Sequence, residues 1–187
     1  MSMFLRTLKH KLSFGLTKFL VQFMPGASYM TFVGPGSSRQ LCNLITSSGA
    51  RKVLVVTDKP LRELGVVDTA VAGLAEAGVD IAYYDGVLPD PTYEQVAEGV
   101  KVMRQHVSDV VLAIGGGSSM DAAKIIAASS ASEDDPRDWV GFGKVKHELP
   151  RIYAIPTTSG TGSEATMGAV ISDPVSHEKG VISGRTL

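Results

Sequence analysis

The chain has 187 residues, 44% of them hydrophobic, which is enough to bury the core of one domain or slightly more. Its 18 Lys and Arg against 19 Asp and Glu give a formal charge of -1, so it lacks the basic surplus typical of nucleic-acid-binding proteins. A single cysteine, Cys42, leaves no intrachain disulfide or cysteine-based metal cluster, and no uncharged apolar run approaches the roughly 18 residues of a membrane span.

The start of the chain is basic, because its first acidic residue is Asp58. Leucines and phenylalanines recur at helical spacing between Leu5 and Phe23, which predicts an amphipathic helix over residues 1–26. Three roles are open for this helix. We favour docking of its apolar face on the rest of the protein or on a second subunit, over binding to a membrane surface or removal as a transit peptide. We expect a cytoplasmic protein, with a mitochondrial location as the alternative if the segment is a transit peptide. We also expect a homodimer.

From residue 27 onward, β-branched apolar runs alternate with helical stretches. Such alternation predicts an α/β fold, a Rossmann-like parallel sheet with helices on both faces. We expect strands over 29–33, 52–57, 80–84, 109–114 and 151–155, and helices over 38–48, before 78, over 92–106 and from 118.

The longest irregular stretch covers residues 129–150. Its acidic residues, Pro136 and glycines predict an excursion over the surface. We expect Trp139 and Phe142 to anchor it.

Ligands of a parallel sheet gather at the carboxyl ends of the strands, and four of these ends are polar here. Three glycines in IGGGSSMDAAK (114–124) let backbone N–H groups approach an anion, and the helix that starts near Ser118 adds unpaired N–H groups. A phosphate would be stabilised there. The alternative is a plain structural turn, because Ser118-x-x-Asp121 is a capping-box pattern, as is Thr161-x-x-Glu164 in the next polar loop. The four polar ends are Asp58, 89–92, 115–118 and 156–164.

Two of these ends support a nucleotide site. The hydroxyl-rich segment TTSGTGS (157–163) offers donors for a phosphate, a ribose or the edge of a base. Asp58 could accept both hydrogen bonds of an adenosine ribose and repel a 2′-phosphate, which favours NAD over NADP. It could equally cap the short helix of KPLREL. The usual dinucleotide fingerprint does not apply, because the acid precedes the glycines here instead of following them.

The segments AIGGGSSMDAAK, IPTTSGTGSEAT, VTDK, DGVLPDPT and VISDPVSHEKGVIS together resemble the amino-terminal half of the iron-containing alcohol dehydrogenases. That family is related in fold to glycerol dehydrogenase and dehydroquinate synthase. The match runs in order from about Phe32 to Leu187. It implies an NAD-binding domain, which we assign to 27–187, followed in the family by an all-helical metal domain that is missing here.

The resemblance also implies the roles of individual residues. Asp90 stands where the family often has Asn, and Ser119 stands where Pro is frequent, a change that leaves the backbone donors in place. By the family pattern, Gly116, Gly117, Ser118 and Ser119 would meet the pyrophosphate and its ribose, Asp58 the adenosine ribose, Thr157, Thr158 and Thr161 the adenine side, Asp90 the cofactor edge, Lys179 a ribose, and Asp121 would lie by the nicotinamide end.

No metal ligand is expected in this chain. In the family, one Asp and three His hold a ferrous ion, and all four would follow Leu187. The four histidines present, His10, His106, His147 and His177, are scattered without i, i+4 pairing, and we expect them to be surface or capping residues.

The resemblance implies reversible hydride transfer between an alcohol and NAD, with a small alcohol or aldehyde as substrate and a divalent metal, expected to be iron, in the full-length enzyme. We expect the 187-residue chain alone to be inactive. Two alternatives stay open: a polyol dehydrogenase or dehydroquinate-synthase-like enzyme of the same fold, and a nucleotide-binding module without catalysis.

Overall fold

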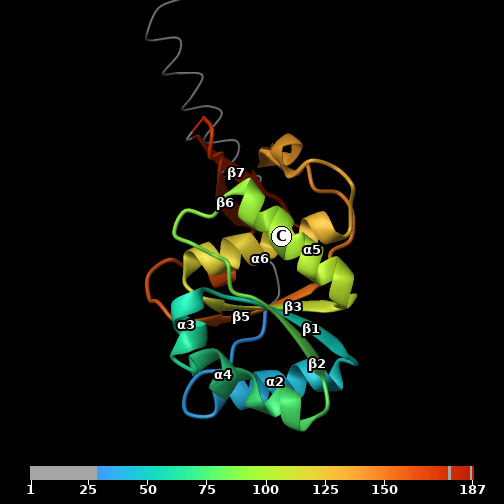
Figure 1. The fold of residues 1–187 in the computed structure, drawn as a ribbon, viewed down its shortest axis with the longest axis vertical. Coiled ribbons are helices and arrows are strands. Elements are labelled where there is room, and N and C mark those ends of the chain that lie inside the picture. The colour runs from blue at the N-terminus through green and yellow to red at the C-terminus, as the bar shows by residue number, and fades with distance from the viewer. Residues whose placement is uncertain (1–28, 177, 186) are drawn as a thin grey trace, which may run out of the picture. The chain divides into compact units, whose positions relative to one another are not determined.

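A computed structural model describes residues 29–176, 178–185 and 187 (Figure 1). The segment 1–26, for which the sequence predicts a helix, lies outside these residues. The elements in chain order are α2 (Ser37–Ser47), β1 (Lys52–Val56), α3 (Lys59–Glu63), α4 (Val66–Glu76), β2 (Asp80–Tyr84), α5 (Tyr93–His106), β3 (Val110–Gly115), α6 (Gly117–Ser130), the 3-10 turn η1 (Pro136–Trp139), β4 (Gly141–Phe142), β5 (Arg151–Pro156), the 3-10 turn η2 (Ser163–Ala165), β6 (Gly168–Ser172) and β7 (Lys179–Ser183).

The main sheet is parallel, with strand order β2-β1-β3-β5. This confirms the predicted α/β class, and the register places Val53 beside Val110 and Val110 beside Arg151. The chain first builds outward from β1 to β2 and then crosses back to β3 and onward to β5. The direction therefore reverses between β1 and β3, and in open α/β sheets this reversal is where ligands bind.

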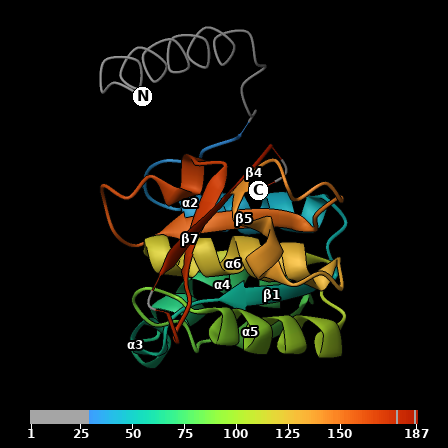
Figure 2. The same ribbon diagram turned by 90° about the horizontal axis from the view of Figure 1, so that it is seen from above.

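Helices cover both faces of this sheet. Successive residues of a strand point to opposite sides, so each buried strand contributes side chains to the core on both faces. Val53 and Val55 face α2 and α4, whereas Leu54 and Val56 face α5 and α6. All four side chains are fully buried. Figure 1 shows α2 and α4 below the sheet and α5 and α6 above it, and Figure 2 shows α5 and α6 running side by side.

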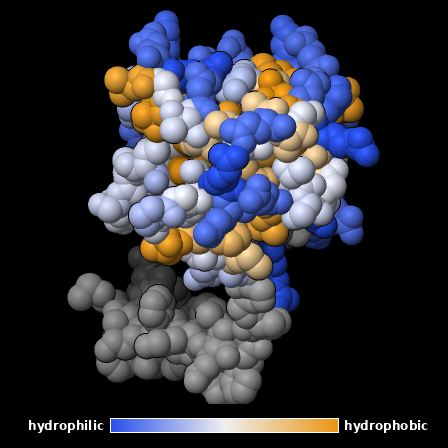
Figure 3. Space-filling model, turned by 90° about the horizontal axis from the view of Figure 1, so that it is seen from below, coloured by the Kyte–Doolittle hydropathy of each residue, from blue (hydrophilic) through white to orange (hydrophobic). Residues whose placement is uncertain are grey.

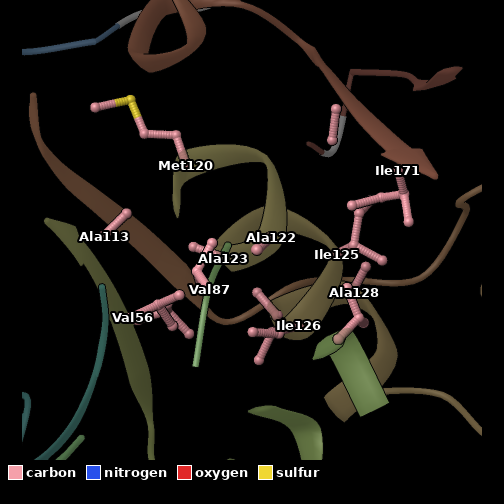
Figure 4. Packing of buried hydrophobic residues seen from close by; sticks show 14 of the residues in the cluster. Val56, Val87, Ala113, Met120, Ala122, Ala123, Ile125, Ile126, Ala128 and Ile171 are labelled. Carbon is pink, nitrogen blue, oxygen red and sulfur yellow. The ribbon is translucent and has the colours of Figure 1, made fainter. Parts of the chain in front are cut away.

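The core on the α6 side is built from small and branched side chains. Figure 4 shows Ala122, Ala123 and Ile126 of α6 directed into the cluster that also holds Val56 of β1. The side chain of Ile171 extends the same cluster to the second sheet. Helix α6 is thus buried on nearly all sides, since the main sheet lies on one side of it and β6 on another.

The second sheet has the order β4-β7-β6, with β6 and β7 antiparallel and β4 parallel to β7. Its strand β4 and the turn η1 lie within the predicted irregular stretch, whereas β6 and β7 come after β5 in the chain. Trp139 is buried as predicted, with 3% of its surface exposed. Phe142 is not an anchor, because 67% of its surface is exposed.

Two further expectations differ from the structure. Residues 29–33 form no strand, and the side chains of Tyr29, Met30 and Val33 are largely exposed, so burial does not favour an extended, paired conformation there. The helix predicted before residue 78 is divided into α3 and α4. Gly65 caps α4 with a left-handed backbone (φ 70°), a conformation that ends α3 and re-aims the chain.

Figure 3 views the molecule from below the orientation of Figure 1, the side on which α2 and α4 lie. Hydrophilic residues cover most of this face, and hydrophobic ones form small, separate groups. Among the described residues, no helix is long and apolar enough to cross a membrane.

Candidate functional site

The carboxyl ends of β1, β3 and β5 bring three of the predicted polar segments together. Asp58 follows β1, the glycine loop (residues 115–119) follows β3, and the second loop (residues 157–163) follows β5. Because β1 and β3 flank the reversal in strand order, Asp58 and the glycine loop lie at the expected ligand position.

The conformation of the glycine loop requires glycine at its start. Gly115 has φ 154°, and a Cβ there would lie 2.3 Å from Ser119 Oγ. Helix α6 begins at Gly117 with Gly116 as its N-cap, and no side chain caps it. The first N–H groups of a helix have no intrahelical partner, so those of α6 are available to an anion.

The capping-box interpretation of Ser118 and Asp121 is therefore wrong, since Gly116 is the N-cap and Asp121 turns elsewhere. The second such pattern fails for the same reason. Gly162, with φ 67°, is the N-cap of η2, and no side chain caps that turn, so Thr161 has no capping role. In both loops a glycine is the N-cap of the helical turn that follows. The hydroxyl side chains of the loops therefore do not serve as caps.

The second loop lies directly on the glycine loop. Thr157 N–H donates to the Gly115 carbonyl at 2.9 Å, which continues the pairing of β3 with β5 by one residue. A Cβ on Gly116 would lie 3.2 Å from Thr158 Oγ1, and one on Gly117 would lie 3.2 Å from both Ser163 Oγ and a methyl of Thr161. Glycines therefore let the two loops meet closely.

Asp58 has a structural role at the start of α3, and its second carboxylate oxygen is directed to the glycine loop. Its Oδ1 accepts a hydrogen bond from Leu61 N–H at 2.9 Å, so Asp58 caps α3. Its Oδ2 would lie 3.7 Å from a Cβ at Gly115, so the other oxygen faces the glycine loop. One carboxylate can cap the helix and still present an acceptor to a ligand at the loop.

Asp90 and Lys179 form a separate pair. Lys179 Nζ donates to Asp90 Oδ1 at 2.6 Å, and this contact joins the loop after β2 to β7. Asp90 adopts a left-handed backbone with φ 56°, a conformation that aspartate tolerates better than most residues. Both side chains are more than half exposed. The structure thus brings these two predicted residues to each other.

Asp121 lies on α6, just after its first turn, and faces β6. Its Oδ2 accepts a hydrogen bond from Val170 N–H at 2.9 Å. Its Oδ1 is buried and has no hydrogen-bond partner in the protein. Burial raises the pKa of the Asp121 carboxyl, and hydrogen bonding from Val170, the charge of Lys124 and the interaction with the Ser163 side chain partly offset this.

Lys124 was not among the residues selected from the sequence. Its side chain is 94% buried on α6, and its ammonium donates to the carbonyls of Thr166 and Gly168 and to Thr166 Oγ1. Burial lowers its pKa. The available signal was a charged residue inside the apolar run MDAAKIIAA, since a buried lysine must find polar partners.

The described part of the chain contains no grouping of three or more His, Cys, Asp or Glu that could hold a metal ion. His106 lies at the amino-terminal edge of the sheet, with its Nε2 3.2 Å from an Asp80 oxygen. His147 Nε2 lies 2.9 Å from the Ala128 carbonyl. His10 and His177 lie outside the described residues. Cys42 is a buried free thiol of α2.

A groove of about 580 Å³ lies between α5 and the segment that follows α6, lined by Tyr93, Arg104 and Arg137 among others. It is remote from the glycine loop. The second loop is open to solvent, because Thr157, Thr158 and Thr161 are exposed, whereas residues 116–118 of the glycine loop are half-buried.

Comparison with known proteins places this arrangement in a family. The model of the iron-containing alcohol dehydrogenases matches residues 29–187. The chain is 39% identical over 151 residues to the NAD-dependent methanol dehydrogenase of Bacillus methanolicus, covering 81% of this chain and 39% of that enzyme.

Solved structures agree with this assignment. A 1,3-propanediol oxidoreductase superposes with a TM-score of 0.82 at 34% identity, covering 87% of this chain and 42% of that one. The sulfoacetaldehyde reductase of Bifidobacterium kashiwanohense, solved with NAD+, gives a TM-score of 0.73 at 25% identity, covering 87% and 44%. The chain thus spans about two fifths of the relatives it matches. It belongs to the family of iron-containing alcohol dehydrogenases.

Proposed function

We propose that this chain is the NAD-binding portion of an enzyme that transfers a hydride reversibly between a small alcohol or aldehyde and NAD. One observation carries the proposal: the glycine loop, the second loop and Asp58 meet at the strand-order reversal of the parallel sheet. The relatives named above support it, since one is NAD-dependent by name and another was solved with NAD+.

The residues present fit a dinucleotide. The first N–H groups of α6 stabilise a pyrophosphate, because they are unpaired and the helix dipole is positive at this end. Substituting the loop glycines would fill the space in which Thr158 and Thr161 approach the loop. We assign the pyrophosphate and its ribose to Gly116, Gly117, Ser118 and Ser119, the adenosine ribose to Asp58, and the adenine side to Thr157, Thr158 and Thr161.

The opposite end of the cofactor is assigned to three charged residues. We assign Asp121, which faces β6 from α6, to the nicotinamide end. Asp90 and Lys179 hold each other at 2.6 Å, and we assign them to the cofactor edge and to a ribose. The paired carboxylate fixes the position of the Lys179 ammonium, which a hydroxyl of the ribose can then approach.

Bound NAD supplies the hydride acceptor for alcohol oxidation. The chain's own residues contribute binding and orientation: the loops hold the cofactor at the edge of the sheet, and Asp58 disfavours a 2′-phosphate by charge repulsion. The described residues provide no site for the iron that the family name implies, so we derive no step from it. We propose that a helical domain of the longer enzyme supplies the metal ligands, and that the enzyme is a cytoplasmic homodimer.

Titration of NADH into the purified 187-residue chain, followed by the fluorescence of the nicotinamide, tests the proposal. We expect saturable binding that ADP-ribose competes away, and weaker binding of NADPH. No alcohol-dependent reduction of NAD is expected from this chain, whereas a chain extended through the helical domain should be active. Absence of NADH binding would contradict the proposal, and alcohol oxidation by the short chain alone would contradict the division of roles.

A further inference from the structure

The second loop and its continuation to β6 are held by few contacts of their own. Residues 157–167 contain no buried side chain, and their only regular element is the short turn η2. Segments with little buried apolar surface open readily in solution. Backbone hydrogen bonds hold this segment near its two ends, from Thr157 N–H to the Gly115 carbonyl and from Gly184 N–H to the Met167 carbonyl, both at 2.9 Å. Further attachment of the segment must come from side chains of α6.

Lys124 makes this contact from the middle of α6. Its Nζ lies 2.8 Å from the Thr166 carbonyl oxygen, 2.7 Å from the Gly168 carbonyl oxygen and 3.1 Å from Thr166 Oγ1. An ammonium group has three donors, so all of them are used on one short stretch of the chain. The stretch lies between η2 and β6.

Asp121, one turn earlier on the same helix, adds a second attachment. Its Oδ2 accepts from the N–H of Val170, an outward-facing residue of β6. Side chains three positions apart lie on the same face of a helix. Lys124 thus binds carbonyl groups of residues 166 and 168, and Asp121 binds the N–H group of residue 170. Both contacts attach the same segment of the chain to α6.

We propose that Lys124, together with Asp121, is a positioning residue that docks residues 157–170 on α6 and so pre-assembles the two nucleotide-binding loops. The consequence for the cofactor rests on the proposed function above. The helix whose N-terminus faces the phosphate is the same helix that holds the second loop. Binding to a preformed pair of loops avoids the free-energy cost of ordering one of them.

Amide hydrogen exchange in the absence of nucleotide tests the docking directly. Lys124→Met keeps an apolar stem and removes the three donors. We expect faster exchange within 157–170, unchanged exchange in β1 and β3, and recovery of protection when NADH is added. The matched control is Lys52→Met, which removes a lysine hydrogen bond to the His106 carbonyl (3.0 Å) at the opposite edge of the sheet and should leave 157–170 unchanged.

NADH affinity gives the second measurement. If the loop is docked in only about a tenth of the Lys124→Met molecules, the dissociation constant rises about tenfold. Lys124→Arg, which can donate to the same carbonyls, should recover most of the affinity and of the local protection. If Lys124→Met does not fold, Lys124→Gln, which retains one donor group, replaces it in both comparisons.

Three results separate the possible failures. Unchanged exchange in 157–170 of the Lys124→Met variant would overturn the proposal. Loss of protection throughout the sheet would also overturn it, because Lys124 would then be a general stability residue. Failure of the parent chain to bind NADH would contradict the proposed function, while the exchange measurement would still decide whether Lys124 positions the loop.

Discussion

Gly117→Val tests whether the glycine loop and the second loop must approach each other closely at residue 117. A Cβ at Gly117 would already lie 3.2 Å from Ser163 Oγ and from a methyl of Thr161, and valine adds two methyl groups to it. The backbone itself does not require glycine here, because Gly117 is an ordinary helical residue. The substitution therefore acts by displacing the second loop and by covering the N–H groups of the first turn.

The magnitude follows from the hydrogen bonds at risk. A hydrogen bond to a charged group contributes about 1.5–3 kcal/mol, so the loss of one N–H to phosphate contact weakens NADH binding roughly 10- to 100-fold. Gly117→Ala, which adds the Cβ alone, should have a smaller effect, because its neighbours need to shift by only a few tenths of an ångström.

Isothermal titration calorimetry with NADH measures both variants against the parent. Urea unfolding serves as the control, and we expect the fold to survive the change, because Gly117 is half-buried and lies outside the hydrophobic core. The reasoning would be refuted by a folded Gly117→Val chain that binds NADH as tightly as the parent. It would also be refuted if alanine were as damaging as valine, since the steric argument predicts a graded response.

Three other predictions concern cofactor choice, packing and pH. Asp58→Asn keeps the acceptor that caps α3 and removes the charge, so the ratio of NADP to NAD affinity should rise about tenfold in parallel titrations, with little change in melting temperature; an unchanged ratio would leave Asp58 only its capping role. Trp139→Ala should cost about 3–5 kcal/mol of unfolding free energy and Phe142→Ala less than about 0.5, because only Trp139 is buried, and equal losses in urea unfolding would contradict this. The contact with His106 holds the pKa of Asp80 below its ordinary value of 3.8, so the stabilising effect of this contact is present above that pH and is lost as the pH falls through the lowered pKa. Asp80→Asn should therefore be less stable than the parent at pH 7 and equal to it near pH 2. A difference in stability that persists near pH 2 would argue against the carboxylate as its source.

The sheet and its covering helices could be predicted because each strand carries its own signal. The run VVLAI of β3 is buried throughout, as a central parallel strand must be, and helical stretches separate it from its neighbours. Residues 29–33 carry a similar run of letters, yet they are largely exposed and unpaired. Periodicity alone does not reveal whether an apolar run finds a neighbouring strand.

The site could be predicted only in part. Glycines and hydroxyls at strand ends indicate an anion site, and the strand order explains why Asp58 lies beside the glycine loop although it precedes that loop by 57 positions. The capping patterns were misleading because the backbone of Gly116 and Gly162 caps both helical turns. The role of Lys124 depends on tertiary contacts with Thr166 and Gly168, which no local pattern encodes. The cofactor contacts of the individual residues stay predictions.

A structure of the 187-residue chain with NAD bound is the most direct test of the central claim, that the two loops and Asp58 form one dinucleotide site. We predict the pyrophosphate on the N–H groups of residues 117–119, the adenosine ribose on Asp58 and the adenine against the second loop. Binding of the nucleotide elsewhere, for example in the groove beside α5, with the N-terminus of α6 left free, would contradict the account.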